Sequence, residues 1–166
     1  MDRSDYFKAS WCLSVKIVSI IISIMLTAIS IYFFLTISAV STFRFIALGL
    51  LPLILLVTAA LFTIRGYYLT DKNLVIQRLF WKTKIDLTGL MRIEKDTVAM
   101  KKSIRTFGNG GLFSLSGWFR NCKLGNYRAW ATDPKRAVVL RFQNRTLVIT
   151  PDNADRFIEK IRQQIK

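Results

Sequence analysis

The chain has 166 residues, with 25 lysines and arginines against 10 aspartates and glutamates, a net charge of +15, two cysteines and no histidine. The absence of histidine removes the most common general base and metal ligand, and it excludes Ser-His-Asp and Cys-His catalytic groups. Two cysteines far apart in sequence cannot form a zinc site. We therefore expect no catalytic residues, no bound metal and no cofactor.

Two long uncharged segments occupy the first part of the chain. Residues 17–40 and 45–64 carry no charged side chain, and as helices they would measure about 36 and 30 Å against a hydrocarbon core of about 30 Å. Only the four residues 41–44 separate them, so residues 15–65 are predicted to form a transmembrane helical hairpin. A buried helix pair in a soluble protein is the alternative; a cleaved signal peptide would have a much shorter apolar segment.

The charges around these segments predict their orientation. Arg3, Lys8 and Lys16 precede the first segment and a cluster of lysines and arginines follows the second, whereas the connection between them holds Arg44 alone. Positive charges accumulate on the cytoplasmic side of membrane proteins. Both termini are therefore expected in the cytoplasm, with residues 1–14 forming a cytoplasmic tail.

A stripe of small polar residues runs along the first apolar segment. Ser19, Ser23, Thr27 and Ser30 are three or four residues apart and share one helix face. Small residues of this kind allow helices to pack closely in a membrane. We expect packing either within the hairpin or between copies of the chain in a homo-oligomer.

The remainder, residues 66–166, is a basic domain. Residues 65–166 contain 21 lysines and arginines against 8 aspartates and glutamates. No linker rich in Gly, Pro or Ser separates them from the second apolar segment, so the domain is held close to the bilayer. Tyr67 and Tyr68 lie where interfacial aromatic residues are usually found.

Short alternating segments in this domain predict strands. "YYLT" and "LVIQRL" flank a turn at residues 71–73, and "KTKIDL" places Ile85 and Leu87 on one face. "MRIEK" likewise places Met91 and Ile93 inward, and "YRAWAT", "AVVLRF" and "TLVIT" follow later. We predict six or seven antiparallel strands.

A helix is predicted from about residue 151 to 165. Thr150 is a suitable N-cap and Pro151 suits the first helical position. An apolar stripe follows at helical spacing, formed by Phe157, Ile158, Ile161 and Ile165. Strands followed by one amphipathic helix indicate an antiparallel barrel with the helix closing one open end.

The domain resembles the bacterial pleckstrin-homology (PH)-like domains of small integral membrane proteins. The resemblance lies in "GYYLTDKNLVIQRLFWKTKIDL", "FGNGGLFSLSGWFRN" with "LGNYRAWATD", and "RTLVITPDNADRFIEKI". It implies a PH-like β-barrel or sandwich capped by a C-terminal helix, and a place in the bacterial inner membrane. It implies no reaction.

The glycine-rich segment 107–121 is interpreted as a long connection between two strands. Gly108, Gly110 and Gly111 would allow a sharp reversal, and the sequence lacks the strand and helix context of a phosphate-binding loop. Its aromatic residues are expected either to pack on the barrel or to insert into the membrane interface.

The positive charge of the domain suggests its partners. We expect a non-enzymatic, membrane-anchored module that binds either anionic lipid head groups or a protein or peptide. The alternative is an accessory subunit of a membrane enzyme or transport complex assembled through the hairpin. Nucleic acid is excluded, because no helix of the domain has a basic face and the chain is confined to the membrane. The residues expected on the binding surface are Lys101, Lys102, Arg105, Arg120, Lys123, Trp118 and Phe119.

Overall fold

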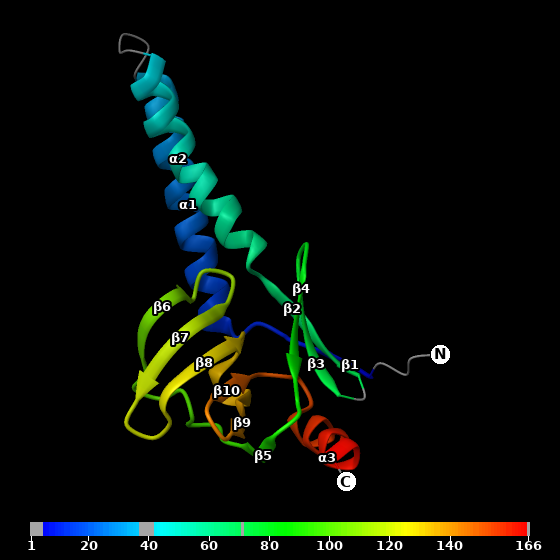
Figure 1. The fold of residues 1–166 in the computed structure, drawn as a ribbon. Coiled ribbons are helices and arrows are strands. Elements are labelled where there is room, and N and C mark those ends of the chain that lie inside the picture. Colours follow the sequence, from blue (N-terminus) through cyan, green and yellow to red (C-terminus); the bar gives the residue numbers. More distant parts are fainter. Residues whose placement is uncertain (1–4, 37–41, 71, 166) are drawn as a thin grey trace.

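The computed structural model describes residues 5–36, 42–70 and 72–165. Two helices, α1 (Leu13–Thr36) and α2 (Thr42–Leu61), lie side by side and project from one end of a domain made of two β-sheets and a C-terminal helix (Figure 1). Residues 42–44, predicted as part of the connection, belong to α2, whereas residues 37–41 lie outside the described residues.

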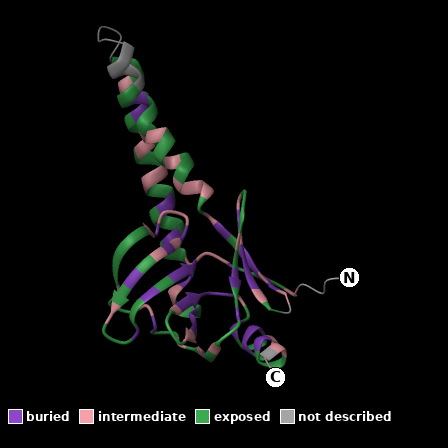
Figure 2. Cartoon of the chain, in the orientation of Figure 1, coloured by how far each residue is buried: buried purple, intermediate pink, exposed green. Residues whose placement is uncertain are grey.

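Only α1, among the described residues, is long and apolar enough by itself to cross a membrane. The apolar section described in α2 is Ala47–Leu61, which is about 22 Å long at 1.5 Å per residue. Figure 2 shows that the helices are exposed over most of their surface, while buried residues concentrate in the β domain. The transmembrane hairpin itself stays a prediction.

The first sheet contains four antiparallel strands in the order β1-β2-β3-β4. They are β1 (Asp5–Lys8), β2 (Ile64–Thr70), β3 (Asn73–Arg78) and β4 (Lys82–Asp86). The segment predicted as an N-terminal tail therefore contains a strand, since β1 pairs with β2 and sets Phe7 opposite Tyr67. The N-terminal residues fold with the domain because Phe7 supplies part of its core.

The second sheet has the order β5-β9-β10-β8-β7-β6. Its neighbours are antiparallel except for the parallel pair of β8 and β10. In the described residues the two sheets do not join into a closed barrel, so the predicted barrel is replaced by two separate sheets. The strands are β5 (Leu90–Lys95), β6 (Ile104–Gly110), β7 (Leu115–Asn121), β8 (Gly125–Ala131), β9 (Val138–Phe142) and β10 (Thr146–Ile149).

Two hydrophobic cores lie on opposite faces of the second sheet. In β9, Val138 and Leu140 belong to the larger core, and Val139 between them belongs to the smaller one. Successive side chains of a strand point to opposite faces, so a strand buried on both faces is apolar throughout. The larger core is shared with the first sheet and with α3 (Ala154–Ile165).

Tyr67, expected at the membrane interface, instead lies in this larger core. Its side chain is fully buried, and its hydroxyl donates a hydrogen bond of 2.6 Å to the carbonyl of Trp130. It also accepts a hydrogen bond of 3.2 Å from the backbone N–H of Thr150. Tyr67 therefore ties β2 to both β8 and the end of β10.

The start of α3 differs from the prediction. The helix begins at Ala154, and the side chain of Asn153 accepts a hydrogen bond from the N–H of Arg156 as an N-cap does. Thr150 is fully buried instead, and its hydroxyl accepts a 2.8 Å hydrogen bond from the N–H of Thr132. The apolar stripe was predicted correctly at Phe157, Ile158 and Ile161, which are buried; the side chain of Ile165 lies outside the described residues.

The predicted inward direction of the Met91 side chain was also wrong. Met91 is 74% exposed although Ile93 is buried as predicted. The register between β5 and β9 shifts between Leu90 and Arg92, so Met91 is the extra residue of a bulge. A bulge reverses the alternation on one side of it, which explains why the period-two pattern failed there.

Candidate functional site: an arginine–aromatic cavity beside the helices

The glycine-rich segment forms a hairpin rather than a long connection. Most of residues 107–121 belongs to the end of β6 and to β7, which are joined by a turn at residues 111–114. Gly108 lies opposite Gly117, with φ of +107° and +144°. A Cβ atom on Gly117 would lie 2.2 Å from the Phe107 carbonyl oxygen. The two glycines therefore allow the backbones of β6 and β7 to approach each other closely within the hairpin.

The turn of this hairpin contacts the helices. The N–H of Phe113 donates a 2.8 Å hydrogen bond to the Ser19 hydroxyl on α1. The hydroxyl of Ser114, which is fully buried, donates a 3.2 Å hydrogen bond to the carbonyl of Phe62 just beyond α2. The ring of Phe113 also lies 5.9 Å from that of Trp11. The hairpin is thus attached to both helices at one end.

A cavity of about 540 Å³ opens between α2 and this hairpin. We call it the arginine–aromatic cavity, because three arginines and four aromatic residues line it together with apolar residues of α2. The arginines are Arg78, Arg105 and Arg128; the aromatic residues are Phe62, Phe107, Trp118 and Trp130; and the α2 residues are Leu55, Thr58 and Ala59.

Arg78, at the end of β3, is the most unusual of these side chains. It is only 7% exposed, and its Nε atom has no hydrogen-bond partner in the described part of the chain. The guanidinium carbon lies 5.2 Å from the ring centre of Phe62 and 5.6 Å from that of Trp81. Burial, with a contribution from Arg128, lowers the pKa of Arg78, yet an arginine keeps its charge in proteins. A buried cation therefore faces the cavity beside two aromatic rings that contact each other.

Arg128 lies on the sheet wall of the cavity. Its guanidinium carbon is 4.5 Å from the ring centre of Trp130 and 5.6 Å from that of Trp118. Trp118 is its cross-strand partner and Trp130 follows two residues later, so the three side chains share one face. Cation–π contacts of this kind hold a guanidinium in place without neutralising it.

Arg105 completes the cationic lining. Its Nη1 atom donates a 3.1 Å hydrogen bond to the carbonyl of Gly108. Among the residues that the structure describes, no aspartate or glutamate lines the cavity. Moreover, none of the three arginines takes part in an ion pair with another described residue. The site is consequently a concentration of positive charge with apolar walls, which suits an anion that carries an apolar part.

The residues predicted for the binding surface are divided by the fold. Arg105 and Trp118 line the cavity. Phe119 is buried in the smaller core and stacks on Tyr127, so it is not part of a surface. The other four are exposed at or near the open end of the hairpin, about 20 Å from its helix-contacting turn at roughly 3.3 Å per strand residue; they are Lys101 and Lys102 before β6, Arg120 in β7 and Lys123 after β7.

The binding surface predicted from the sequence did not include Arg78 and Arg128. Arg78 and Arg128 each have a tryptophan two or three residues further along the chain, but only the tertiary structure adds Phe62 and Trp118 and brings both arginines to one cavity. The one local signal was the density of tryptophan and phenylalanine around arginine in "RLFWK" and "YRAW".

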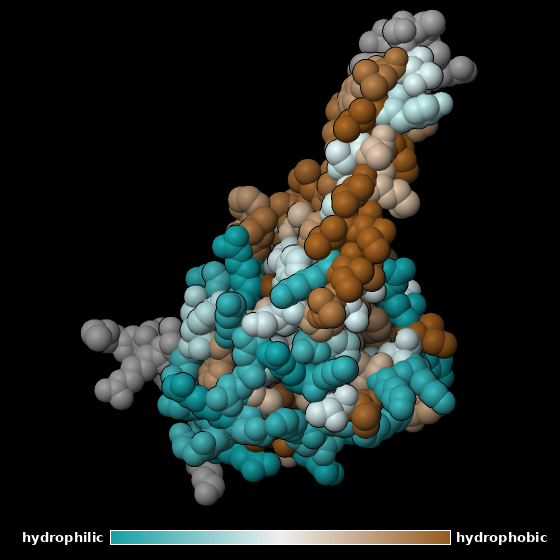
Figure 3. Space-filling model, turned by 180° about the vertical axis from the view of Figure 1, so that it is seen from behind, coloured by the Kyte–Doolittle hydropathy of each residue, from teal (hydrophilic) through white to brown (hydrophobic). Residues whose placement is uncertain are grey.

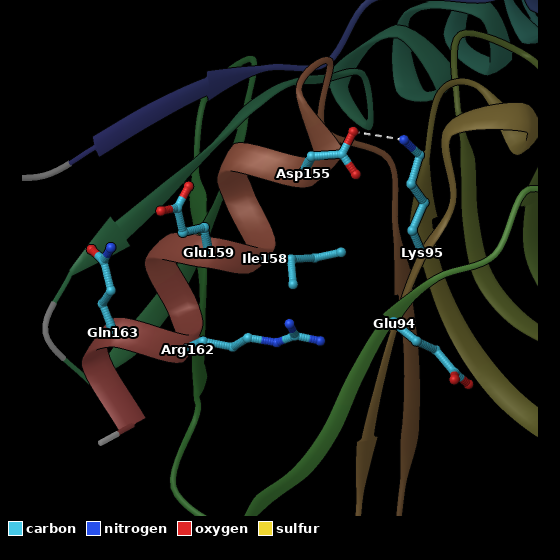
Figure 4. A pocket seen from close by; sticks show the side chains of 7 residues that line it. All are labelled: Glu94, Lys95, Asp155, Ile158, Glu159, Arg162 and Gln163. Carbon is cyan, nitrogen blue, oxygen red and sulfur yellow. Dashed lines mark hydrogen bonds and ion pairs between the residues drawn. The ribbon is translucent and has the colours of Figure 1, made fainter.

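A second cavity of about 560 Å³ lies between α3 and β5 (Figure 4). Charges of both signs line it, among them Glu94, Lys95, Glu159 and Arg162. Lys95 and Asp155 form an ion pair of 2.8 Å across its edge. Because its charges are mixed and partly paired, this cavity offers no preference for an anion or a cation.

A family model described as a bacterial PH domain matches residues 65–165, which extend from β2 to the end of α3. No curated protein matches the chain, and no solved structure matches it either. The matched region contains three of the four strands of the first sheet, the whole second sheet and α3, but neither the apolar helices nor β1.

Proposed function

This chain belongs to the bacterial PH domain family, and we propose that it is a non-enzymatic module anchored in the bacterial inner membrane, where its domain binds anionic lipid head groups at the cytoplasmic face. The observation that carries the proposal is the location of the arginine–aromatic cavity, which lies between α2 and the basic domain. PH domains generally serve as binding modules for lipids or proteins, and an unpaired cationic site next to apolar helices favours lipid.

The exposed surface of the helices supports anchoring. Ile20, Ile21 and Ile24 on α1 are 58%, 58% and 65% exposed, and Figure 3 shows apolar surface along the helices that ends where the hydrophilic domain begins. Leaving such an apolar surface in contact with water costs about 25 cal/mol of free energy for each Å², compared with burying it. The whole of α2 has 20 residues, Arg44 among them, or about 30 Å; its described apolar section, Ala47–Leu61, is shorter than the hydrocarbon core.

The attachment of the domain supports its position at the bilayer surface. β2 begins only three residues after α2 ends, without a flexible linker. Immediately before α1 begins, the N–H of Cys12 donates a 3.1 Å hydrogen bond to the carbonyl of Thr132 in the domain. Because both helices connect directly to folded parts of the domain, its helix-facing end cannot move far from the membrane.

The proposed orientation is tested by a reporter fused to the C-terminus. With both termini in the cytoplasm, a reporter that is active only outside the cytoplasm should stay silent, and a cytoplasmic reporter should be active. The reverse pattern would overturn the orientation derived from the positive charges.

Lipid binding is tested on the full chain in nanodiscs. The domain should unfold at a higher temperature in discs that contain phosphatidylglycerol than in discs of phosphatidylcholine alone, because a ligand of the folded state stabilises it. Part of the difference should decrease with added salt, since exposed charges are screened over about 8 Å at physiological ionic strength. Equal transition temperatures at low salt would contradict the proposed function.

A further inference from the structure

Arg78 has an electrostatic requirement that the described protein leaves unmet. A buried charge is strongly unfavourable unless it is paired and hydrogen-bonded. Arg78 is 7% exposed, no described residue hydrogen-bonds to its Nε atom, and the nearby Arg128 disfavours its charge further. The aromatic rings of Phe62 and Trp81 compensate in part. An anion between the two guanidinium groups would supply the missing interaction.

The shape and chemistry of the cavity restrict what that anion is. Guanidinium groups bind phosphate oxygens through paired, charge-assisted hydrogen bonds. The opposite side of the same cavity consists of Leu55, Thr58 and Ala59 on α2. The hydroxyl of Thr58 is already used, since it donates a 2.7 Å hydrogen bond to Ile54 of its own helix. This side therefore offers apolar contacts and no free side-chain hydrogen-bond donor from α2.

A ligand that satisfies both sides carries a phosphate next to a hydrocarbon chain. Inorganic phosphate would satisfy the arginines but leave the α2 side uncovered. The volume of about 540 Å³ suits a head group with the first part of a chain, as ligand cavities commonly measure about 300–1,000 Å³. The remaining chain would follow the exposed surface of α2, where Leu51 and Leu55 are each 54% exposed.

We propose that the arginine–aromatic cavity holds one anionic phospholipid, with its phosphate between Arg78 and Arg128 and its acyl chains along α2. The inference rests on the proposed function and makes it specific. Binding is to a single lipid in a defined site rather than to a diffuse charged surface. The site is built from the end of α2, from β3 and from the β6–β7–β8 strands, so it forms only when the helices are attached to the domain.

The experiment uses the full chain purified in a mild neutral detergent. Short-chain phosphatidylglycerol, phosphatidylcholine with the same chains, and inorganic phosphate are titrated separately, and binding is followed by tryptophan fluorescence, because Trp118 and Trp130 line the cavity. Phosphatidylglycerol should give a saturable change and the other two should not. A response to inorganic phosphate at equal concentration would overturn the assignment to lipid.

Substitutions locate the site. Arg78→Gln should weaken phosphatidylglycerol binding by about tenfold to a hundredfold, as expected for the loss of a charge-assisted hydrogen bond. Ala59→Trp keeps every charge but fills the α2 side of the cavity, and it should weaken phosphatidylglycerol binding by a similar factor. This variant keeps the test valid if Arg78→Gln fails to fold. The matched control is Arg120→Gln, an exposed arginine on the same hairpin outside the cavity, with an effect within about threefold.

The outcomes separate this inference from the proposed function. If the two cavity variants bind phosphatidylglycerol as well as the unaltered chain does, the defined site is refuted, even when anionic nanodiscs still stabilise the domain. If Arg120→Gln weakens binding as much as Arg78→Gln, the lipid is held by overall charge and the defined site is again refuted. Loss of stabilisation by anionic nanodiscs in the unaltered chain would instead contradict the proposed function.

Discussion

Substitution of Gly117 by alanine should destabilise the β6–β7 hairpin through two separable effects. Gly117 has a φ of +144°, and a Cβ atom there would lie 2.2 Å from the carbonyl oxygen of Phe107. A backbone conformation that disfavours side chains costs about 1–3 kcal/mol, and forcing extra volume into a packed site costs about another 1–3 kcal/mol. We expect Gly117→Ala to lower the free energy of unfolding by about 2–6 kcal/mol.

The chain contains a matched control at Gly111. Its φ is +137°, but nothing lies within 4 Å of a Cβ atom placed there, so Gly111→Ala introduces the backbone strain without the clash. The two variants should therefore differ by about 1–3 kcal/mol, or about 2–12 °C in transition temperature for a chain of this size. Thermal unfolding of the full chain in detergent, followed by tryptophan fluorescence, measures both.

Equal losses of stability in the two variants would refute this reasoning. They would mean that β6 and β7 move apart at Gly117 without cost to admit the methyl group. A second measurement sharpens the test. If the close approach shapes the wall of the arginine–aromatic cavity, Gly117→Ala should also reduce phosphatidylglycerol binding at temperatures where the chain is folded, whereas Gly111→Ala should not.

Four further predictions concern the buried polar network and the contacts between the helices and the domain. Tyr67→Phe should lower the free energy of unfolding by about 1–3 kcal/mol, because two buried backbone groups lose their partner; an unchanged urea midpoint would contradict this. Burial raises the pKa of Tyr67 from 10.0 to about 12, so the unfolded chain loses this proton first. The stabilisation that comes from this raised pKa is fully present below pH 10, and the free energy of unfolding should fall by up to about 3 kcal/mol between pH 10 and 12. The decrease should be smaller in Tyr67→Phe. Asp152→Ala removes the 2.9 and 2.6 Å hydrogen bonds from the N–H and hydroxyl of Ser10, so amide hydrogen exchange around residues 8–12 should accelerate; unchanged protection would show that this attachment is unimportant. Ser19→Ala leaves the N–H of Phe113 without its partner and should lower the transition temperature, whereas Ser23→Ala, on the same stripe, should not.

Several features of the fold follow from local patterns that the sequence displays openly. The apolar helices, the strands β4 and β9, and the inward face of α3 were predicted because each depends on side chains a few residues apart. A period of two or of 3.6 residues records which face is buried. The same periodicity failed at Met91, where one inserted residue in β5 reverses the alternation.

The interpretation of residues 107–121 failed for a different reason. Glycines commonly mark turns, so Gly108, Gly110 and Gly111 suggested a reversal of the chain. In the structure Gly111 does lie in the turn, whereas Gly108 lies opposite Gly117 in paired strands, where the absence of side chains permits a close backbone contact. Which of these two uses of glycine applies depends on the partner strand, which the local sequence does not identify.

The sequence alone determined what composition and short-range periodicity can encode: two apolar helices, a basic β domain and a C-terminal amphipathic helix. Only the tertiary structure decided that Asp5–Lys8 joins the first sheet, that Phe119 faces a core, and that Arg78 and Arg128 meet beside α2. These are contacts between residues about 50 or more positions apart, or choices between two faces of a strand. The free energy of these contacts depends on which surfaces come together. A local sequence pattern carries no information about the distant segment that a residue will pack against.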